Sequence, residues 1–267
     1  IFWVDSLGQR LFSATAHGTE IRAWDFPASI GSMALRRGGG AIVALRTGIF
    51  TLDMANGDLT RVADPGHDRA RLTLNDGKVD RQGRFVFGSM VVDEAASPCA
   101  ELYRLDADFL LHRLRGGIGI SNGPCWSPDG RCFYFSDSGT NQMAVYDYDT
   151  ARGTLSGMRP FVTLPRNGPG RLDGACVDAE GCIWSALCGA GTIVRYQPDG
   201  SVDRIIHMPV RRVTSVAFGG EALDILFVTS MARGLEAQPM ADHPMRGALF
   251  AVHGLGIKGI AEPCFAG

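Results

Sequence analysis

Three polar residues, Asn75, Asn122 and Asp173, occupy the same place in three similar segments of the chain. Each is followed eight residues later by a glycine that closes a polar turn before an apolar run. Asn and Asp supply amide and carboxylate oxygens, and clusters of such oxygens hold hard divalent cations such as Ca²⁺ or Mg²⁺. If the fold brings these positions together, the sequence predicts a metal site.

The segments belong to a repeat. Ser32 precedes Gly40 by the same eight residues, and a looser copy begins at Thr214-Ser215. Successive copies start 43, 47, 51 and 41 residues apart. Each copy reads as a short strand, a turn closed by glycine, and further strands, because Asp, Pro and Gly at fixed offsets form turns between β-type runs. Repeats of ~40 to 50 residues with several strands each are typical of a β-propeller.

The chain opens on an apolar strand pattern, Ile1 to Ser6, that aligns with the second strand of a later copy, Phe133 to Ser138. This alignment puts one inner strand upstream of Ile1 and gives six blades in total. We therefore predict an all-β, six-bladed β-propeller that forms a single domain over residues 1–267, with its first inner strand missing from this chain. A β-sandwich or barrel is the alternative, but the repeated eight-residue offsets argue against it.

In a propeller the first strand of every blade lines the central channel, so equivalent positions converge on the axis. The predicted ring is made of oxygen-bearing residues: Ser32, Asn75, Asn122, Asp173, and Thr214 or Ser215. The alternative interpretation is that these residues have no ligand and only form turns at the starts of strands. The spacing alone does not decide between a metal site and turn formation.

Composition excludes several classes of protein. Lys and Arg (26) nearly balance Asp and Glu (28), with no basic block, so we expect no nucleic-acid partner. No apolar run reaches the ~18 residues of a membrane span, so we expect no membrane partner. Seven cysteines with no CxxC pair fit core thiols in a reducing cytoplasm better than disulfides or zinc.

Five stretches carry a resemblance to a known family. They are LNDGKVD (74–80), SNGPCWSPDG (121–130), RLDGACVDAEG (171–181), VTSVAFGG (213–220) and GIKGIAEPCFAG (256–267). In this order they resemble the gluconolactonase and regucalcin (senescence marker protein) family of sugar-lactone hydrolases. The resemblance implies a carbohydrate-metabolising lactonase that opens aldono-1,4- or 1,5-lactones to aldonic acids.

The resemblance also implies one divalent metal ion, such as Ca²⁺, Zn²⁺, Mn²⁺, Mg²⁺ or iron(II), at one end of the channel. Of the family's three ligands, the Asn of SNG maps to Asn122 and the Asp of DG maps to Asp173. The third ligand, an early Glu, falls at the upstream position. For substrate binding, the Asn of NDG maps to Asn75 and an acidic residue maps to Asp93. Where many members carry an Arg, this chain has Thr73, which leaves the substrate's identity open.

Lactone opening needs a polarised carbonyl, an attacking water and stabilisation of the developing oxyanion. Asp173 is the predicted catalytic residue, and it either orients and deprotonates that water or serves only as a metal ligand. The predicted partner is a small sugar lactone, and the predicted state is a monomer or weak homo-oligomer. The alternative function is a non-catalytic propeller that binds a small molecule, a metal ion or a protein.

Overall fold

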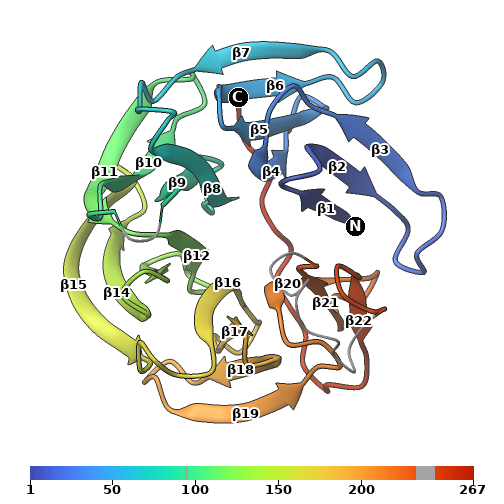
Figure 1. Cartoon of the computed structure of the whole chain (residues 1–267), viewed down its shortest axis with the longest axis vertical. Helices are drawn as coiled ribbons and strands as arrows, with labels where there is room; N and C mark the ends of the chain where they lie inside the picture. The colour runs from blue at the N-terminus through green and yellow to red at the C-terminus, as the bar shows by residue number, and fades with distance from the viewer. Residues whose placement is uncertain (94–95, 233–243) are drawn as a thin grey trace.

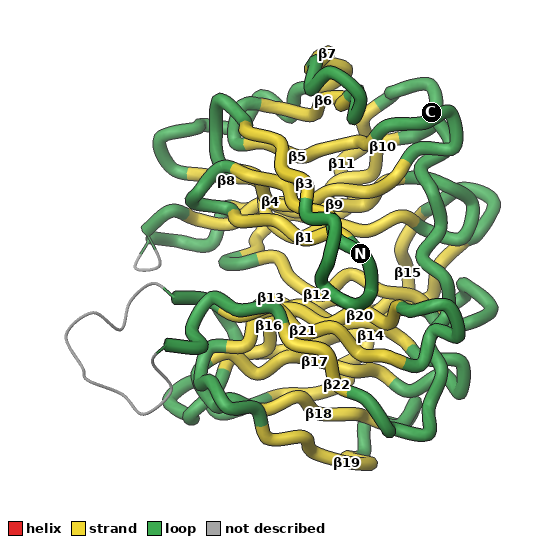
Figure 2. Tube along the Cα trace, turned by 90° about the vertical axis from the view of Figure 1, so that its right-hand side faces the viewer, coloured by secondary structure: helices red, strands yellow, loops and turns green. Residues whose placement is uncertain are grey.

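The computed structural model describes residues 1–93, 96–232 and 244–267, and within these ranges every regular element is a β-strand. Six sheets are arranged as blades around a central axis (Figure 1). In the view turned by 90°, the connecting loops gather at the two ends of the strands (Figure 2). The described residues contain no helix with the length and apolarity needed to cross a membrane. The predicted all-β, six-bladed propeller is confirmed.

Four blades contain four strands, each ordered from the axis outward as the chain runs. The first of these is β4 (Ile30–Leu35), β5 (Ala41–Leu45), β6 (Gly48–Leu52) and β7 (Leu59–Ala63). The second is β8 (Leu72–Val79), β9 (Phe85–Val91), β10 (Ala100–Leu105) and β11 (Leu111–Ile118). The third is β12 (Ser121–Trp126), β13 (Cys132–Asp137), β14 (Gln142–Asp149) and β15 (Thr154–Thr163). The fourth is β16 (Arg171–Val177), β17 (Ile183–Cys188), β18 (Thr192–Tyr196) and β19 (Val202–His207).

The other two blades have three strands each among the described residues. One is β20 (Val213–Gly219), β21 (Ile225–Ser230) and β22 (Phe250–Val252), and the other is β1 (Phe2–Asp5), β2 (Arg10–Ser13) and β3 (Arg22–Asp25). Strand β1 pairs with β2 from Phe2↔Ser13 to Asp5↔Arg10 and lies on the inner side of its blade. Among the described residues this blade has three strands, one fewer than the blade formed by β4–β7.

The eight-residue offset between ring residue and glycine has a local cause. The glycines at these positions, Gly40, Gly83, Gly130 and Gly181, have φ between 70° and 96°, which a side chain with a Cβ adopts only at a cost. In two blades an aspartate just before the turn caps it: Asp178 Oδ1 accepts the N–H of Cys182 at 3.0 Å, and Asp80 Oδ1 accepts that of Arg84 at 2.8 Å. Turn and cap together fix how far each inner strand extends.

The hydrophobic core lies between neighbouring blades rather than at the axis. One buried cluster joins Val86 and Leu102 of the β8–β11 blade to Phe133 and Tyr146 of the β12–β15 blade, and similar clusters fill the next gaps. Because each blade is packed on both faces, the inner strands are held in fixed positions around the channel. This packing sets the geometry of the ring.

The C-terminal segment, residues 254–267, crosses the channel at the end where the inner strands finish (Figure 1). We call it the C-terminal strap. Its backbone hydrogen-bonds four different blades, through Ala179 N to Lys258 O (2.9 Å), Gly259 N to Leu223 O (2.7 Å), Phe265 N to Leu35 O (2.8 Å) and Ala266 N to Gly83 O (2.9 Å). The strap therefore ties distant blades together and covers this end of the channel.

We expect the strap to contribute to stability mainly through Phe265, which is fully buried and packs 6.0 Å from the Phe109 ring, centroid to centroid. Phe265→Ala should lower the free energy of unfolding by about 3–5 kcal/mol, because it leaves a cavity in a packed cluster. The matched control is Phe2→Ala. Because Phe2 is 39% exposed, this change should lower the free energy of unfolding by only about 0.5 kcal/mol. Urea denaturation measures both; equal losses in the two variants would contradict a stabilising role for the strap.

Candidate functional site

The inner strands bring the predicted ring residues to the end of the channel opposite the strap. The Ser32 hydroxyl on β4 donates to the Asn75 carbonyl at 2.9 Å. The Asn75 side-chain amide on β8 in turn donates to Asn122 Oδ1 at 3.0 Å and to the Ser121 carbonyl at 2.7 Å. Three of the equivalent positions are thus in direct hydrogen-bonded contact across three blades, which turn formation alone would not require.

A fourth residue fixes the orientation of Asn122. This side chain is 6% exposed, and its Nδ2 donates to Ser138 Oγ at 2.9 Å. The Ser138 hydroxyl donates onward to the carbonyl of Leu172, the residue before Asp173. Because the amide nitrogen is committed to Ser138, Oδ1 is the atom that Asn122 presents to the ring, and it retains a lone pair beyond the bond from Asn75.

Two carboxylates share the ring. Burial raises the pKa of Asp173 well above its usual value, and the negative charge of Asp76 raises it further. Burial also raises the pKa of Asp76, although the N–H groups of Gly123 and Gly77, each at 2.8 Å, favour its charged form. Both side chains keep partial contact with solvent in the channel. Two like charges in a poorly solvated place are unfavourable, so a bound cation would be stabilised there.

Irregular pairing explains how neighbouring residues reach the same site. Adjacent side chains of a regular strand point to opposite faces, yet Asn75 contacts Asn122 and Asp76 contacts Gly123 on the same neighbouring strand. A β-bulge re-aims side chains in this way. Five inner strands each contain such an irregularity, where the pairing with the next strand changes register. It lies between Ile30 and Ser32, between Leu74 and Gly77, between Asn122 and Cys125, between Leu172 and Ala175, and between Val213 and Ser215.

The other predicted residues lie further out. Thr73 is half-buried on β8, two residues before Asn75. Asp93 is exposed, two residues beyond the end of β9. At the fifth ring position the Thr214 hydroxyl shares a hydrogen bond with that of Thr229, at 2.8 Å. The structure therefore brings Asn75, Asn122 and the Asp173 strand together, while the substrate roles of Thr73 and Asp93 stay predictions.

The residues present fit a hard divalent ion. Asn122 Oδ1 and the Asp173 carboxylate are oxygen donors, the kind that Ca²⁺ and Mg²⁺ prefer, and water or substrate completes such sites. Across the described ranges, no three His, Cys, Asp or Glu side chains form a group that could hold a metal. The early glutamate implied by the family resemblance has no counterpart in β1–β3. Among the described residues, the Asp173 carboxyl and the Asn122 amide are therefore the candidate direct ligands, with Asp76 as a second acidic group nearby.

Sequence reasoning missed Asp76 and Ser138. Asp76 stands next to Asn75, but regular alternation would point it away from the ring. Ser138 lies sixteen residues after Asn122, and the residues at that offset from Asn75 and Asp173 are Val91 and Gly189, which have no polar side chain. Only the NDG stretch itself, with two oxygen-bearing residues in succession, carried a signal for Asp76.

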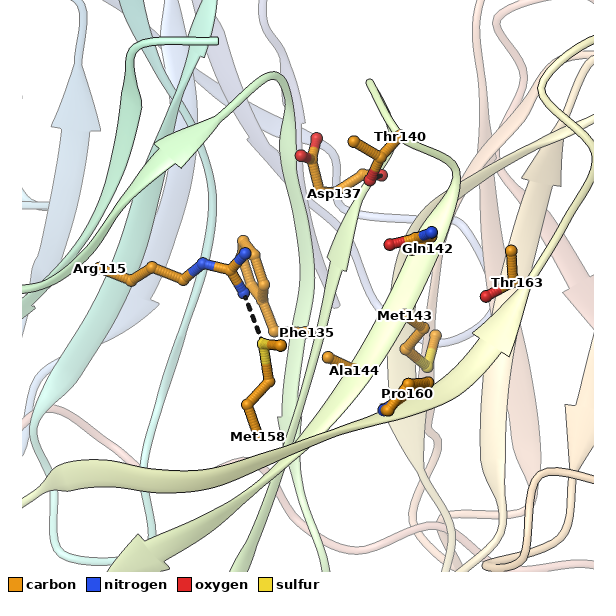
Figure 3. A pocket seen from close by; sticks show the side chains of 10 residues that line it. All are labelled: Arg115, Phe135, Asp137, Thr140, Gln142, Met143, Ala144, Met158, Pro160 and Thr163. Atoms are coloured by element: carbon orange, nitrogen blue, oxygen red, sulfur yellow. Dashed lines mark hydrogen bonds between the residues drawn. The ribbon is translucent and has the colours of Figure 1, made fainter.

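A cavity away from the axis, between β11 and β13–β15, offers no comparable chemistry (Figure 3). Its cation, Arg115, hydrogen-bonds the Tyr146 hydroxyl and contacts Met158 Sδ at 3.5 Å. Its carboxylate, Asp137, accepts backbone N–H groups, among them that of Ile120 at 3.0 Å. Since both charged groups are engaged in holding the blade, the ring is the candidate functional site.

Fold and site together define a six-bladed β-propeller with an oxygen-donor site at one end of its channel. Comparison with known sequences makes this more specific. The sequence pattern of the SMP-30/gluconolactonase/LRE-like region matches residues 1–232. The chain belongs to this family, which confirms the resemblance seen in the sequence and the expectation of a lactonase.

Individual relatives agree with the family match. The 6-deoxy-6-sulfogluconolactonase of Pseudomonas putida is 37% identical over 100% of this chain and 91% of its own. The regucalcin of Danio rerio is 33% identical over 100% of this chain and 90% of its own. Among solved structures, a calcium-binding protein, regucalcin, from Agrobacterium tumefaciens superposes with a TM-score of 0.92 at 28% identity, covering 99% of this chain and 88% of that one.

Proposed function

We propose that this protein is a divalent-metal-dependent lactonase that opens sugar lactones, either aldono-1,4- or 1,5-lactones, to the corresponding aldonic acids. The observation that carries the proposal is the pairing of two enclosed carboxyls, Asp173 and Asp76, beside the oriented Oδ1 of Asn122. A protein that only bound a partner through this end of the channel would gain nothing from placing two like charges there.

Each ring residue has a role in the proposed reaction. A bound divalent ion polarises a carbonyl and stabilises the negative charge that develops on its oxygen. Asp173 and Asn122 would hold that ion, and Asp173 would also orient the attacking water. Asn75, fixed by bonds to Ser121 and Asn122, would position the sugar hydroxyls, together with Thr73 and Asp93 at the entrance. Holding substrate and water in fixed relative positions supplies much of the rate enhancement expected of such a site.

The relatives support the finer parts of the proposal. One is named for a gluconolactone with a sulfo group at carbon 6, and another is titled a calcium-binding protein. The donor atoms on this chain are all oxygens, which favours Ca²⁺, Mg²⁺ or Mn²⁺ over Zn²⁺. We therefore propose a six-carbon aldonolactone as the substrate, with or without an anionic group at carbon 6, and a hard divalent ion as the cofactor.

The cysteines support a cytoplasmic site of action. All seven are free thiols, and Cys125, Cys176 and Cys182 are buried. Free thiols persist in a reducing compartment, whereas disulfides form in the oxidising environment of secreted proteins.

The direct test is acid release from a panel of lactones. The protein, supplied with Ca²⁺, Mg²⁺ or Mn²⁺, is mixed with 1,4- and 1,5-aldonolactones, with 6-sulfo and 6-phospho derivatives, and with an open-chain ester as the control. We expect ion-dependent release from at least one sugar lactone and none from the ester. No release from any lactone with any ion would contradict the proposal and favour a propeller that binds its ligand without transforming it.

A further inference from the structure

An ion pair joins the inner strand β8 to the strap, with a largely buried lysine on the strand and an exposed glutamate on the strap. Lys78 Nζ on β8 donates to Glu262 Oε1 of the strap at 2.9 Å, and the two side chains are 15% and 45% exposed. Burial is the largest influence on the pKa of Lys78 and lowers it, but the charge and hydrogen bond of Glu262, with contributions from Cys176 and Cys125, together raise the pKa above its usual value. Lys78 is therefore held as an ammonium inside the channel by a residue far away in the sequence.

The positions equivalent to Lys78 on β12 and β16 carry thiols rather than charged groups. Three residues beyond each ring position stand Lys78 on β8, Cys125 on β12 and Cys176 on β16. Both thiols are buried, and burial raises their pKa, that of Cys176 to about 12, so both are neutral at physiological pH. Glu262 is the anion hydrogen-bonded to Lys78, while Asp76 on the same strand interacts with the charge of Lys78 without such a bond being formed.

This pair is close enough to influence the ring. Lys78 follows Asp76 by two residues on the same strand, a rise of about 7 Å. The two charges act on Asp76 in opposite directions: that of Lys78 lowers the pKa of Asp76, and that of Glu262 raises it. The charges of Lys78 and Glu262 therefore influence the place where the cation would bind.

An uncompensated ammonium at that depth would repel a divalent ion, because Coulomb energies are weakly screened inside a protein. We propose that Glu262 is a positioning residue for the metal site: by pairing with Lys78, it removes a positive charge that would otherwise oppose the cation held by Asn122 and Asp173. The inference rests on the proposed function. It gives the strap a role in setting the affinity of the site in addition to closing the channel.

The test is a thermodynamic cycle on metal affinity, measured by isothermal titration calorimetry with Ca²⁺ and Mn²⁺ and independent of turnover. Glu262→Gln should weaken ion binding about tenfold or more, because it leaves Lys78 charged and unpaired beneath the site. Adding Lys78→Met to this variant should return the affinity to within about threefold of wild type, since neither position then carries a charge. The matched control, Glu221→Gln, removes an exposed acid and should leave the affinity unchanged.

The outcomes separate the inference from the proposed function. If the wild type binds the ion and Glu262→Gln binds it equally well, the inference is overturned, even if thermal stability falls, because Glu262 then only ties down the strap. If the affinity falls but Lys78→Met does not restore it, the inference is also overturned. Absence of ion binding to the wild type would overturn the proposed function itself. Should Glu262→Gln fail to fold, Lys78→Met alone decides: equal or tighter binding supports the inference, and weaker binding overturns it.

Discussion

Replacing Asp173 by asparagine should reduce lactone hydrolysis by about 10³-fold or more, because in the proposed mechanism this carboxylate both holds the ion and orients the water. The same variant, freed of metal, should be as stable as the wild type or up to about 2 kcal/mol more stable. The reason is that burial and the charge of Asp76 both disfavour the ionised form of Asp173, so a neutral side chain of the same shape relieves that cost. Initial rates of acid release and urea denaturation in chelator measure the two effects.

The combination of lost activity with retained stability is what identifies a functional residue. A carboxylate that merely supported the fold would lose both when substituted. Asp224→Asn, which changes an exposed aspartate before β21, is the control and should alter neither quantity. The prediction fails if Asp173→Asn keeps more than about a tenth of the wild-type activity, or if activity disappears only because the variant unfolds.

The fold was predictable because its determinants are local and repeated. Turn glycines with positive φ, such as Gly83 and Gly181, recur at a fixed distance from the ring residues. Each is followed by an apolar strand, so blade number and strand order could be obtained by alignment of the chain with itself. The apolar run 41–45, which directly follows Gly40, forms β5. Register errors are suppressed here, since a one-residue slip would expose the packed face of a blade.

The site was only partly predictable, because its remaining determinants are neither local nor repeated. The bulge that brings Asp76 beside Asn75 has no residue signature that distinguishes it from regular strand. Ser138, which orients Asn122, has no polar counterpart at the same offset from Asn75 or Asp173. Glu262 reaches Lys78 across 184 positions of sequence, and no pattern within either segment indicates that contact. Asp93, placed near the substrate by family resemblance, is exposed beyond β9, and its role depends on measurements with substrate.

The charged groups of the ring determine how strongly the proposed site would attract a cation. In the proposed site Asn122 is neutral, so the attraction for a cation would come from the carboxyl groups of Asp173 and Asp76. The backbone N–H groups of Gly77 and Gly123 favour the charged form of Asp76 and oppose the rise in its pKa that burial causes. Charge that is fixed in place by hydrogen bonds costs little further ordering when the ion arrives. The ring is thus prepared for a cation before one binds.

Removing divalent ions should therefore abolish hydrolysis and destabilise the protein at the same time. Dialysis against a chelator should eliminate acid release, and adding back Ca²⁺, Mg²⁺ or Mn²⁺ should restore it. An ion that binds only the folded state stabilises it by about 2.7 kcal/mol at a free concentration 100 times its dissociation constant. Thermal unfolding followed against ion concentration measures this increase, and full activity after complete chelation would refute metal dependence.

The Asp173→Asn variant turns this experiment into a test of where the ion binds. Without ions the variant should equal or exceed the wild type in stability, because it lacks the buried charge. With ions the order should reverse, since only the wild type gains binding energy at the ring. A crossing of the two stabilities as the ion is added would locate the binding site at Asp173. Parallel increases in both proteins would instead mean that the stabilising ion binds somewhere else on the propeller, and that Asp173 acts on the lactone without it.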